Sequence, residues 1–88
     1  MNEEKLSKLG YKGAINPFAI HAWLIIEKKV FAEVYFSLFH KQWSIQNYLV
    51  DVKKAQRMPW TDGKLDSYKF DTYKSALEFA VLSTINML

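Results

Sequence analysis

The apolar and polar positions change their period several times along the chain, and each period predicts a kind of element. In residues 3–9, Leu6 and Leu9 are spaced to share a helix face, and Gly10 follows where a left-handed helix cap would stand. A short helix and a frayed tail are both compatible with this stretch.

The next segment opens with Asn16 and Pro17. Asn caps helix N-termini well and Pro favours the first helical position, so a helix over residues 17–29 is predicted. On a helical wheel, one side of this helix carries Ala19, Ile20, Trp23, Leu24 and Ile26, and the other carries His21, Lys28 and Lys29.

Residues 30–38 then alternate with a period of two and are rich in β-branched and aromatic side chains, which predicts a strand. One continuous helix over residues 17–39 is the competing interpretation. A second strand is predicted over residues 43–52, where the alternation is less clean. The connection at 39–42 has no Gly, Asn or Pro to fix a turn type, so the hairpin rests on the strand pattern.

Residues 53–64 are predicted to form a long loop that ends in the turn signal Asp62-Gly63, and residues 65–70 a third strand. A closing helix completes the order α-α-β-β-β-α. Short consecutive strands favour an antiparallel meander, and the helices must cover one face of it to bury their apolar sides. We therefore predict one α+β domain over residues 1–88, with two layers and three strands.

The closing helix follows a capping pair, Asp71 and Thr72, and only Lys74 and Glu78 in it are charged. That is too little charge for the outside of an ordinary surface helix. Its predicted core side consists of Ala76, Leu77, Ala80, Val81, Thr84, Ile85 and Leu88.

The other side of the closing helix carries Phe79 and Leu82, and Ile25 stands on the polar side of the helix at 17–29. We predict that these three residues form a protein interface, either between copies of the chain or with another protein. The alternative is that helix 17–29 covers Phe79 and Leu82 within one chain, since scattered surface apolar residues are ordinary.

Composition narrows the class of protein. The chain has 88 residues, of which 50% are hydrophobic, so it is long enough for one core, and it has no cysteine. The missing cysteines exclude disulfides and thiolate metal sites. The mixed charges at the start of the chain do not resemble a signal peptide, and no run of about 18 uncharged apolar residues exists. We expect a cytoplasmic protein with no membrane partner.

The residues that carry chemistry are few. Neither His21 nor His40 has a partner at catalytic or metal-ligand spacing, and Glu27 and Glu33 are more simply solvated carboxylates than an acid/base pair. The three glycines form neither a P-loop nor a dinucleotide-binding loop. The sequence therefore predicts a protein that is not an enzyme and that holds no cofactor and no metal.

The predicted loop at 53–64 contains a basic cluster, Lys53, Lys54 and Arg57, with Trp60 nearby. The net charge of +3 is modest, and three phosphate contacts would change affinity only about 40-fold between 50 and 200 mM salt. A solvated loop is the simpler interpretation. In that interpretation Trp60 is a loop anchor packed on the sheet. Weak nucleic-acid binding, with an exposed Trp60 stacked on a base, is the alternative.

Several stretches resemble small prophage and mobile-element proteins of gut bacteria, which carry a Trp-Leu helix running into a strand and a closing helix of the form x-T-Y-E-E-A-L-E. The matching stretches are Lys8-Leu9-Gly10-Tyr11, Trp23-Leu24-x-x-Glu27-Lys28, Val30-x-x-Glu33-Val34 and Phe70-x-Thr72-Tyr73-x-x-Ala76-Leu77-Glu78. The resemblance implies a fold and a genomic setting, and no active site. Ile25, Phe79 and Leu82 are apolar where that pattern tends to place arginine, charged or small residues.

The sequence thus predicts a small interaction module, derived from a phage or mobile element, that self-associates as a homodimer or binds a host or phage protein. A weak accessory nucleic-acid binder that uses the loop at 53–64 is the second hypothesis.

Overall fold

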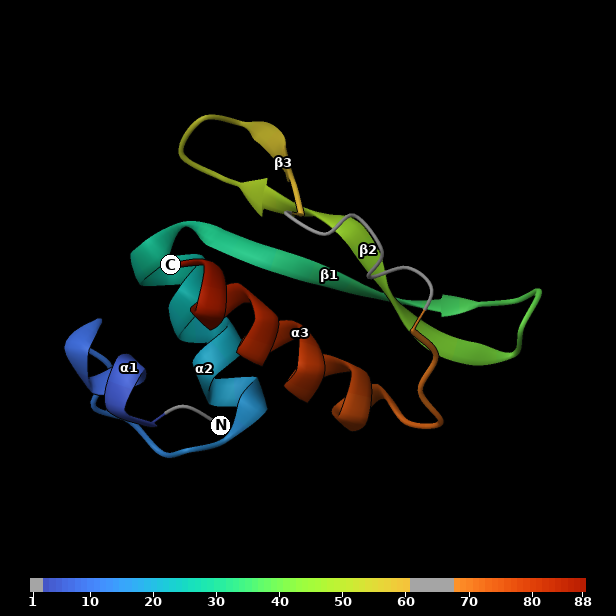
Figure 1. Cartoon of the computed structure of the whole chain (residues 1–88), viewed down its shortest axis with the longest axis horizontal. Coiled ribbons are helices and arrows are strands. Elements are labelled where there is room, and N and C mark those ends of the chain that lie inside the picture. Colours follow the sequence, from blue (N-terminus) through green and yellow to red (C-terminus); the bar gives the residue numbers. More distant parts are fainter. Residues whose placement is uncertain (1–2, 61–67) are drawn as a thin grey trace.

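The computed structural model describes residues 3–60 and 68–88 and shows an α+β fold in which helices cover one face of a three-stranded sheet (Figure 1). The elements in chain order are α1 (Glu3–Lys8), α2 (Pro17–Trp23), the π-helix η1 (Leu24–Lys28), β1 (Val30–Ser37), β2 (Gln42–Asp51), β3 (Gln56–Pro59) and α3 (Tyr73–Met87). The predicted fold class and order of elements are confirmed.

Local signals start and stop the helices as expected. The Asn16 side chain accepts hydrogen bonds from the backbone N–H groups of Phe18 (2.8 Å) and Ala19 (3.4 Å), and Pro17 follows at the first helical position. Thr72 caps α3 by accepting from the N–H of Ser75 at 3.1 Å. Gly10 has φ 98°, the left-handed conformation that ends a helix at little cost for glycine.

The sheet is an antiparallel meander in the order β1-β2-β3. Its ladder is irregular at one point, because Ala32 pairs with Leu49 and Val34 with Ile45, so that Glu33 stands opposite three residues of β2. The two extra residues preserve the period of two, and Ile45 and Leu49 both stay on the buried face.

The third strand lies earlier in the chain than predicted. β3 occupies residues 56–59 of the predicted loop and pairs with the end of β2. The predicted strand at 65–70 lies largely outside the described residues, and within the described part Phe70 forms an isolated bridge with Trp43. β3 exists because Met58, paired with Leu49, and Trp60 both pack into the core.

The helix predicted over 17–29 buries only part of the side that the wheel indicated. Pro17, Ile20 and Leu24 are buried, whereas Ala19 and Ile26 are exposed. The α-helix also gives way to the π-helix η1, which Lys29 closes in a left-handed conformation at φ 60°. Neighbouring apolar positions left the orientation open, and packing against α3 selected it.

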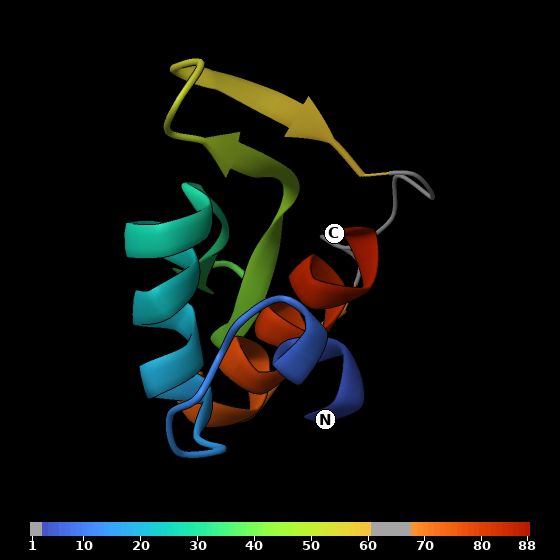
Figure 2. The same cartoon turned by 90° about the vertical axis from the view of Figure 1, so that its left-hand side faces the viewer.

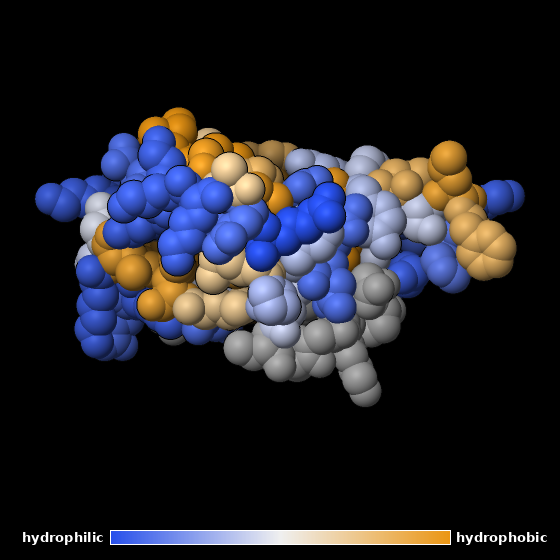
Figure 3. Space-filling model, turned by 90° about the horizontal axis from the view of Figure 1, so that it is seen from above, coloured by the Kyte–Doolittle hydropathy of each residue, from blue (hydrophilic) through white to orange (hydrophobic). Residues whose placement is uncertain are grey.

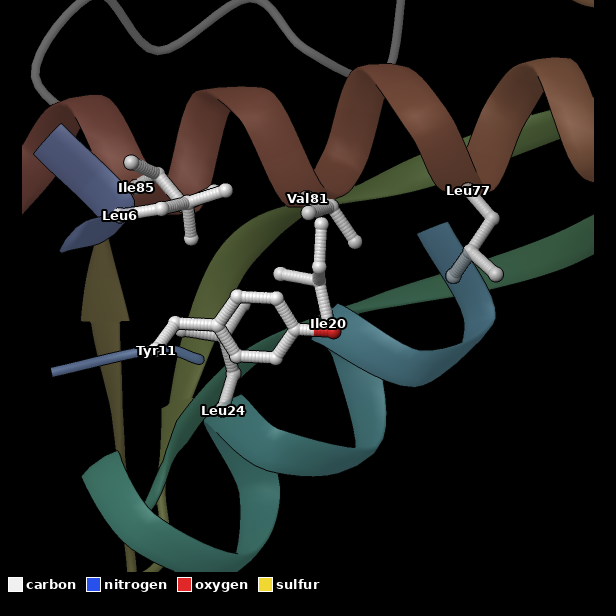
Figure 4. Close-up of a cluster of buried hydrophobic side chains, with 7 residues drawn as sticks. All are labelled: Leu6, Tyr11, Ile20, Leu24, Leu77, Val81 and Ile85. Atoms are coloured by element: carbon white, nitrogen blue, oxygen red, sulfur yellow. The ribbon is translucent and has the colours of Figure 1, made fainter. Parts of the chain in front are cut away.

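The buried side chains of helix α3 pack in two directions. Towards α1 and α2 it contributes Leu77, Val81 and Ile85 to a cluster with Leu6, Tyr11, Ile20 and Leu24 (Figure 4). Towards the sheet, Ala80 packs with Ala32, Ile45, Leu49 and Trp60. The predicted core residues of α3 are buried except Leu88, which is exposed at the end of the helix.

No helix among the described residues is both long enough and apolar enough to cross a membrane.

Candidate functional site: the aromatic end of the sheet

The three residues predicted as a protein interface are half-buried and do not form one surface. α2 packs on the side of α3 that contains Leu77, Val81 and Ile85, and η1 continues α2 with Ile25 in it. Phe79 instead packs against Phe70 and Tyr68, with ring centroids 5.5 and 4.9 Å apart. Helix α2 therefore does not cover Phe79 and Leu82, contrary to the alternative expected from the sequence.

Phe79 and Leu82 line a shallow hollow of about 350 Å³ together with Phe70, Ser75 and Glu78. The hollow is wide open and two of its five lining residues are polar. It joins two of the predicted interface residues in one place, but it exposes little of Phe79.

The most exposed apolar side chains lie instead in the turn between β1 and β2. Leu38 and Phe39 are 84% and 89% exposed. The backbone closes this turn, since Lys41 N–H donates to Ser37 C=O at 2.7 Å and Lys41 adopts φ 55°. His40 N–H also donates to Ser37 Oγ at 3.2 Å. These bonds define the turn through the backbone and Ser37, and the one ring contact of Phe39 there is with the neighbouring His40, at 5.0 Å between ring centroids.

Behind the turn, a row of aromatic rings connects the hairpin to the first residues of both long helices. Phe36 pairs with Trp43 across the strands, with ring centroids 5.2 Å apart. Trp43 contacts Tyr73 at the start of α3 (5.0 Å), and Tyr73 stacks on Phe18 in the first turn of α2 (6.2 Å). The Asn16 and Thr72 caps fix where these helices begin, and therefore position Phe18 and Tyr73.

We call this surface the aromatic end, and it consists of Phe18, Phe36, Leu38, Phe39, Trp43 and Tyr73. Five of its members are among the ten large apolar residues that are exposed in the described part of the chain. The tip of the hairpin stands out as an apolar projection in the space-filling view (Figure 3, right). Such a concentration is unusual, because single exposed apolar residues are usually scattered.

The size of the aromatic end suits a protein partner. Phe18, Phe36 and Tyr73 are 39–48% exposed. At roughly 200 Å² for each aromatic side chain, the exposed parts of these three rings and of Phe39 amount to about 440 Å². One side of a standard protein interface buries about 800 Å², a little over half of it apolar. The four rings alone therefore supply about the apolar area that one side of such an interface contains.

The residues predicted to contact nucleic acid are divided between the surface and the core. Lys53 and Lys54 are exposed in the turn between β2 and β3, and the guanidinium of Arg57 lies 4.7 Å from the centre of the Tyr48 ring. Trp60 is only 6% exposed, and its indole N–H donates to Gln46 C=O at 3.0 Å. Trp60 is thus a core anchor of the strand end, with no open ring face for a base.

The titratable groups considered for catalysis lie apart. His21 packs edge-on against Phe31 at 5.8 Å, and burial lowers its pKa. His40 lies in the exposed hairpin turn, and Glu27 and Glu33 are exposed on η1 and β1. Among the described residues no group of three His, Asp or Glu side chains gathers as metal ligands would.

Sequence reasoning missed the aromatic end, although one signal for it was visible. The connection after β1 has no typical turn residue and contains Phe39 directly after Leu38, where polar residues are the rule. Apolar side chains at a turn are hard to bury within the chain, so this pair could have pointed to an exposed apolar surface.

No protein-family model, no curated protein and no solved structure matches this chain.

Proposed function

We propose that this protein is a non-enzymatic protein-interaction module that self-associates through its aromatic end. The supporting observation is the concentration of Leu38, Phe39 and the neighbouring rings on one projecting surface. The resemblance to small mobile-element proteins supports a phage or mobile-element setting.

A second copy of the chain is the partner favoured by the surface itself. A two-fold interface places the same patch on both sides, so it must be self-complementary. The aromatic end offers apolar area together with groups of both charge signs. Lys41 lies in the turn, and Asp71 accepts a hydrogen bond from Gln42 Nε2 at 3.0 Å. Two copies can therefore bury the rings against each other while Lys41 faces Asp71 at the rim.

Analytical ultracentrifugation over a range of concentrations tests this proposal. The variant Leu38→Ser with Phe39→Ser should weaken association at least tenfold, because each side chain contributes roughly 1.5–3 kcal/mol when it is buried. The matched control is Ile26→Ser with Val52→Ser, which removes two exposed apolar side chains from other surfaces and should leave association unchanged.

A chain that stays monomeric at about 1 mM would contradict self-association, since that concentration detects a binding free energy as small as about 4 kcal/mol. A host or phage protein would then be the partner to seek. Equal weakening by the control variant would contradict the assignment of the surface.

A further inference from the structure

We propose that the opposite end of the sheet binds single-stranded nucleic acid through a basic surface that the fold assembles from three segments. This proposal goes beyond self-association and rests on different residues. We call the surface the basic end, and it consists of Lys28, Lys29, Lys53, Lys54 and Arg57.

The strand pairing brings together two lysine pairs that are 24 residues apart in the sequence. Val30 pairs with Asp51, and Val52 N–H donates to Lys29 C=O at 2.8 Å. Lys28 and Lys29 at the end of η1 therefore lie beside the β2–β3 turn that carries Lys53 and Lys54. Figure 2 looks onto this end of the molecule, with η1 and the β2–β3 turn both on its left.

Four of the five cations are exposed, and Lys28 is half-buried. Lys29 and Ala55 have φ 60° and 52°, so the chain reverses sharply at both places. Asp51 is buried, and its carboxylate accepts a hydrogen bond from Lys54 N–H at 3.1 Å. The Asp51 carboxylate is thus engaged with the backbone. Among the residues that the structure describes, none of the five cations forms an ion pair.

Two of the cations lie over aromatic rings, one on the open face of the sheet and one in the helix layer. Arg57 belongs to β3 opposite Val50, and its guanidinium stacks over Tyr48. Lys28 Nζ lies 5.4 Å from the centre of the Trp23 ring. Tyr48, Val50 and Arg57 share the sheet face that the helices leave open, and Val52 is exposed beside them. A ring-stacked guanidinium next to other cations is the arrangement on which unpaired bases stack while phosphates are neutralised.

The charge balance and the shape favour a strand of nucleic acid over other anions. The exposed carboxylates on the neighbouring η1 and β1 are Glu27 and Glu33, so the five cations outnumber them. Cations spread over three segments suit repeating phosphates better than one small anion. The apolar side chains among them match unstacked bases better than the phosphate backbone of a duplex.

Five phosphate contacts set the expected salt dependence. A single strand gives a slope of about −0.7 per contact on logarithmic axes. Affinity should therefore fall about a hundredfold between 50 and 200 mM NaCl. Lys53, Lys54 and Arg57, the three cations that lie close together in the sequence, would alone give a fall in affinity of less than twentyfold for the same strand.

Fluorescence anisotropy with labelled oligo-dT and oligo-U of about 20 nucleotides tests the proposal, with a DNA duplex of equal length in parallel. Lys29→Gln with Lys54→Gln takes one cation from each of two segments. It should weaken binding about 20-fold at 0.1 M salt and reduce the salt slope by about 1.4. The matched control, Lys12→Gln with Lys74→Gln, removes two exposed lysines elsewhere and should change affinity less than twofold.

Tyr48→Ala should lower affinity for the single strands about fivefold or more through lost stacking. Absence of binding at 50 mM NaCl, or an equal loss in the control variant, would overturn the site. A duplex that binds as tightly as the single strands, or a Tyr48→Ala variant that binds normally, would overturn the assignment to single strands. None of these outcomes depends on self-association, which ultracentrifugation reports separately.

Discussion

The two ends of the β1–β2 ladder are built from the same two strands and differ completely in chemistry. At one end, the cross-strand pair Phe36 and Trp43 is followed by the apolar turn. At the other, the pair Val30 and Asp51 is flanked by exposed lysines. A small sheet therefore presents two separate surfaces, one suited to apolar burial and one to anions.

The difference arises from where the helices lie along the ladder. α2 and α3 both begin beside the Phe36–Trp43 pair, as the contacts of Phe18 and Tyr73 show, so the turn at 38–41 projects beyond them. At the basic end the chain reverses twice through left-handed residues, and reversals place side chains in solvent. The positions of the helices and of the chain reversals leave residues exposed at both ends of the ladder. The sequence decides whether these exposed residues are apolar or charged.

The largest expected effect is on the residue that attaches β3 to the sheet. Trp60→Ala should cost about 3–5 kcal/mol of unfolding free energy, because it leaves a cavity and removes the hydrogen bond to Gln46 C=O. Phe39→Ser at the other end should change stability by less than about 0.5 kcal/mol. Urea unfolding measures both. Equal effects would show that Trp60 is not a core anchor.

The next largest effect is the difference in salt dependence between the two ends. Self-association through the aromatic end depends on apolar burial and should keep its dissociation constant within about threefold between 50 and 200 mM NaCl. Nucleic-acid binding at the basic end should weaken about a hundredfold over the same range. Ultracentrifugation and anisotropy at matched salt concentrations make the comparison. Parallel salt dependence at both ends would mean that they do not act as separate surfaces.

The helix caps are expected to act on one end only. Thr72→Ala should cost about 1 kcal/mol, because the Ser75 N–H loses its acceptor. Since Tyr73 follows directly, association should weaken as the first turn of α3 frays, while nucleic-acid binding should not change. Thr72→Ser, which keeps the hydroxyl, is the control. A change in nucleic-acid affinity would show that the two ends are coupled through α3.

The smallest effect concerns His21, whose pKa is held below its usual 6.5 by burial. Between the folded-state pKa and 6.5 the unfolded chain binds more protons, so stability is fully present above pH 6.5 and falls as the pH drops. Thermal unfolding from pH 7.5 to 5 should show this loss, and His21→Gln should reduce it. An unchanged profile in the variant would assign the loss to other groups.

Local chemistry was sufficient to predict much of the fold. Asn16 and Thr72 are helix caps because their side chains reach backbone N–H groups two or three residues away, and Gly10 ends α1 because glycine accepts a positive φ. The alternation in residues 30–38 predicted β1, because neighbouring residues of one strand point to opposite faces of the sheet. Each of these features depends only on residues close in the sequence.

Other features required contacts between distant segments. The residues of β3 were assigned to a loop, because they form a strand only when β2 lies beside them and Met58 pairs with Leu49. Trp60, which follows β3, is buried in the same core cluster. The buried side of α2 and η1 was predicted only in part, because Ile26 is as apolar as Ile20, and packing against α3 decided between them. The helical period correctly placed Phe79 away from the core side of α3. It could not show that Phe70 and Tyr68 pack against the Phe79 ring.

The sequence by itself determined where the helices start, which strands alternate and how many apolar and basic residues the chain carries. Only the tertiary structure decided that α3 packs on both the other helices and the sheet, that Leu38 and Phe39 project, and that Lys29 lies beside Val52 and the lysines that follow it. The physical reason is range. Caps and periodicity act within a few residues, whereas exposure of a side chain is set by segments that meet it from elsewhere in the chain.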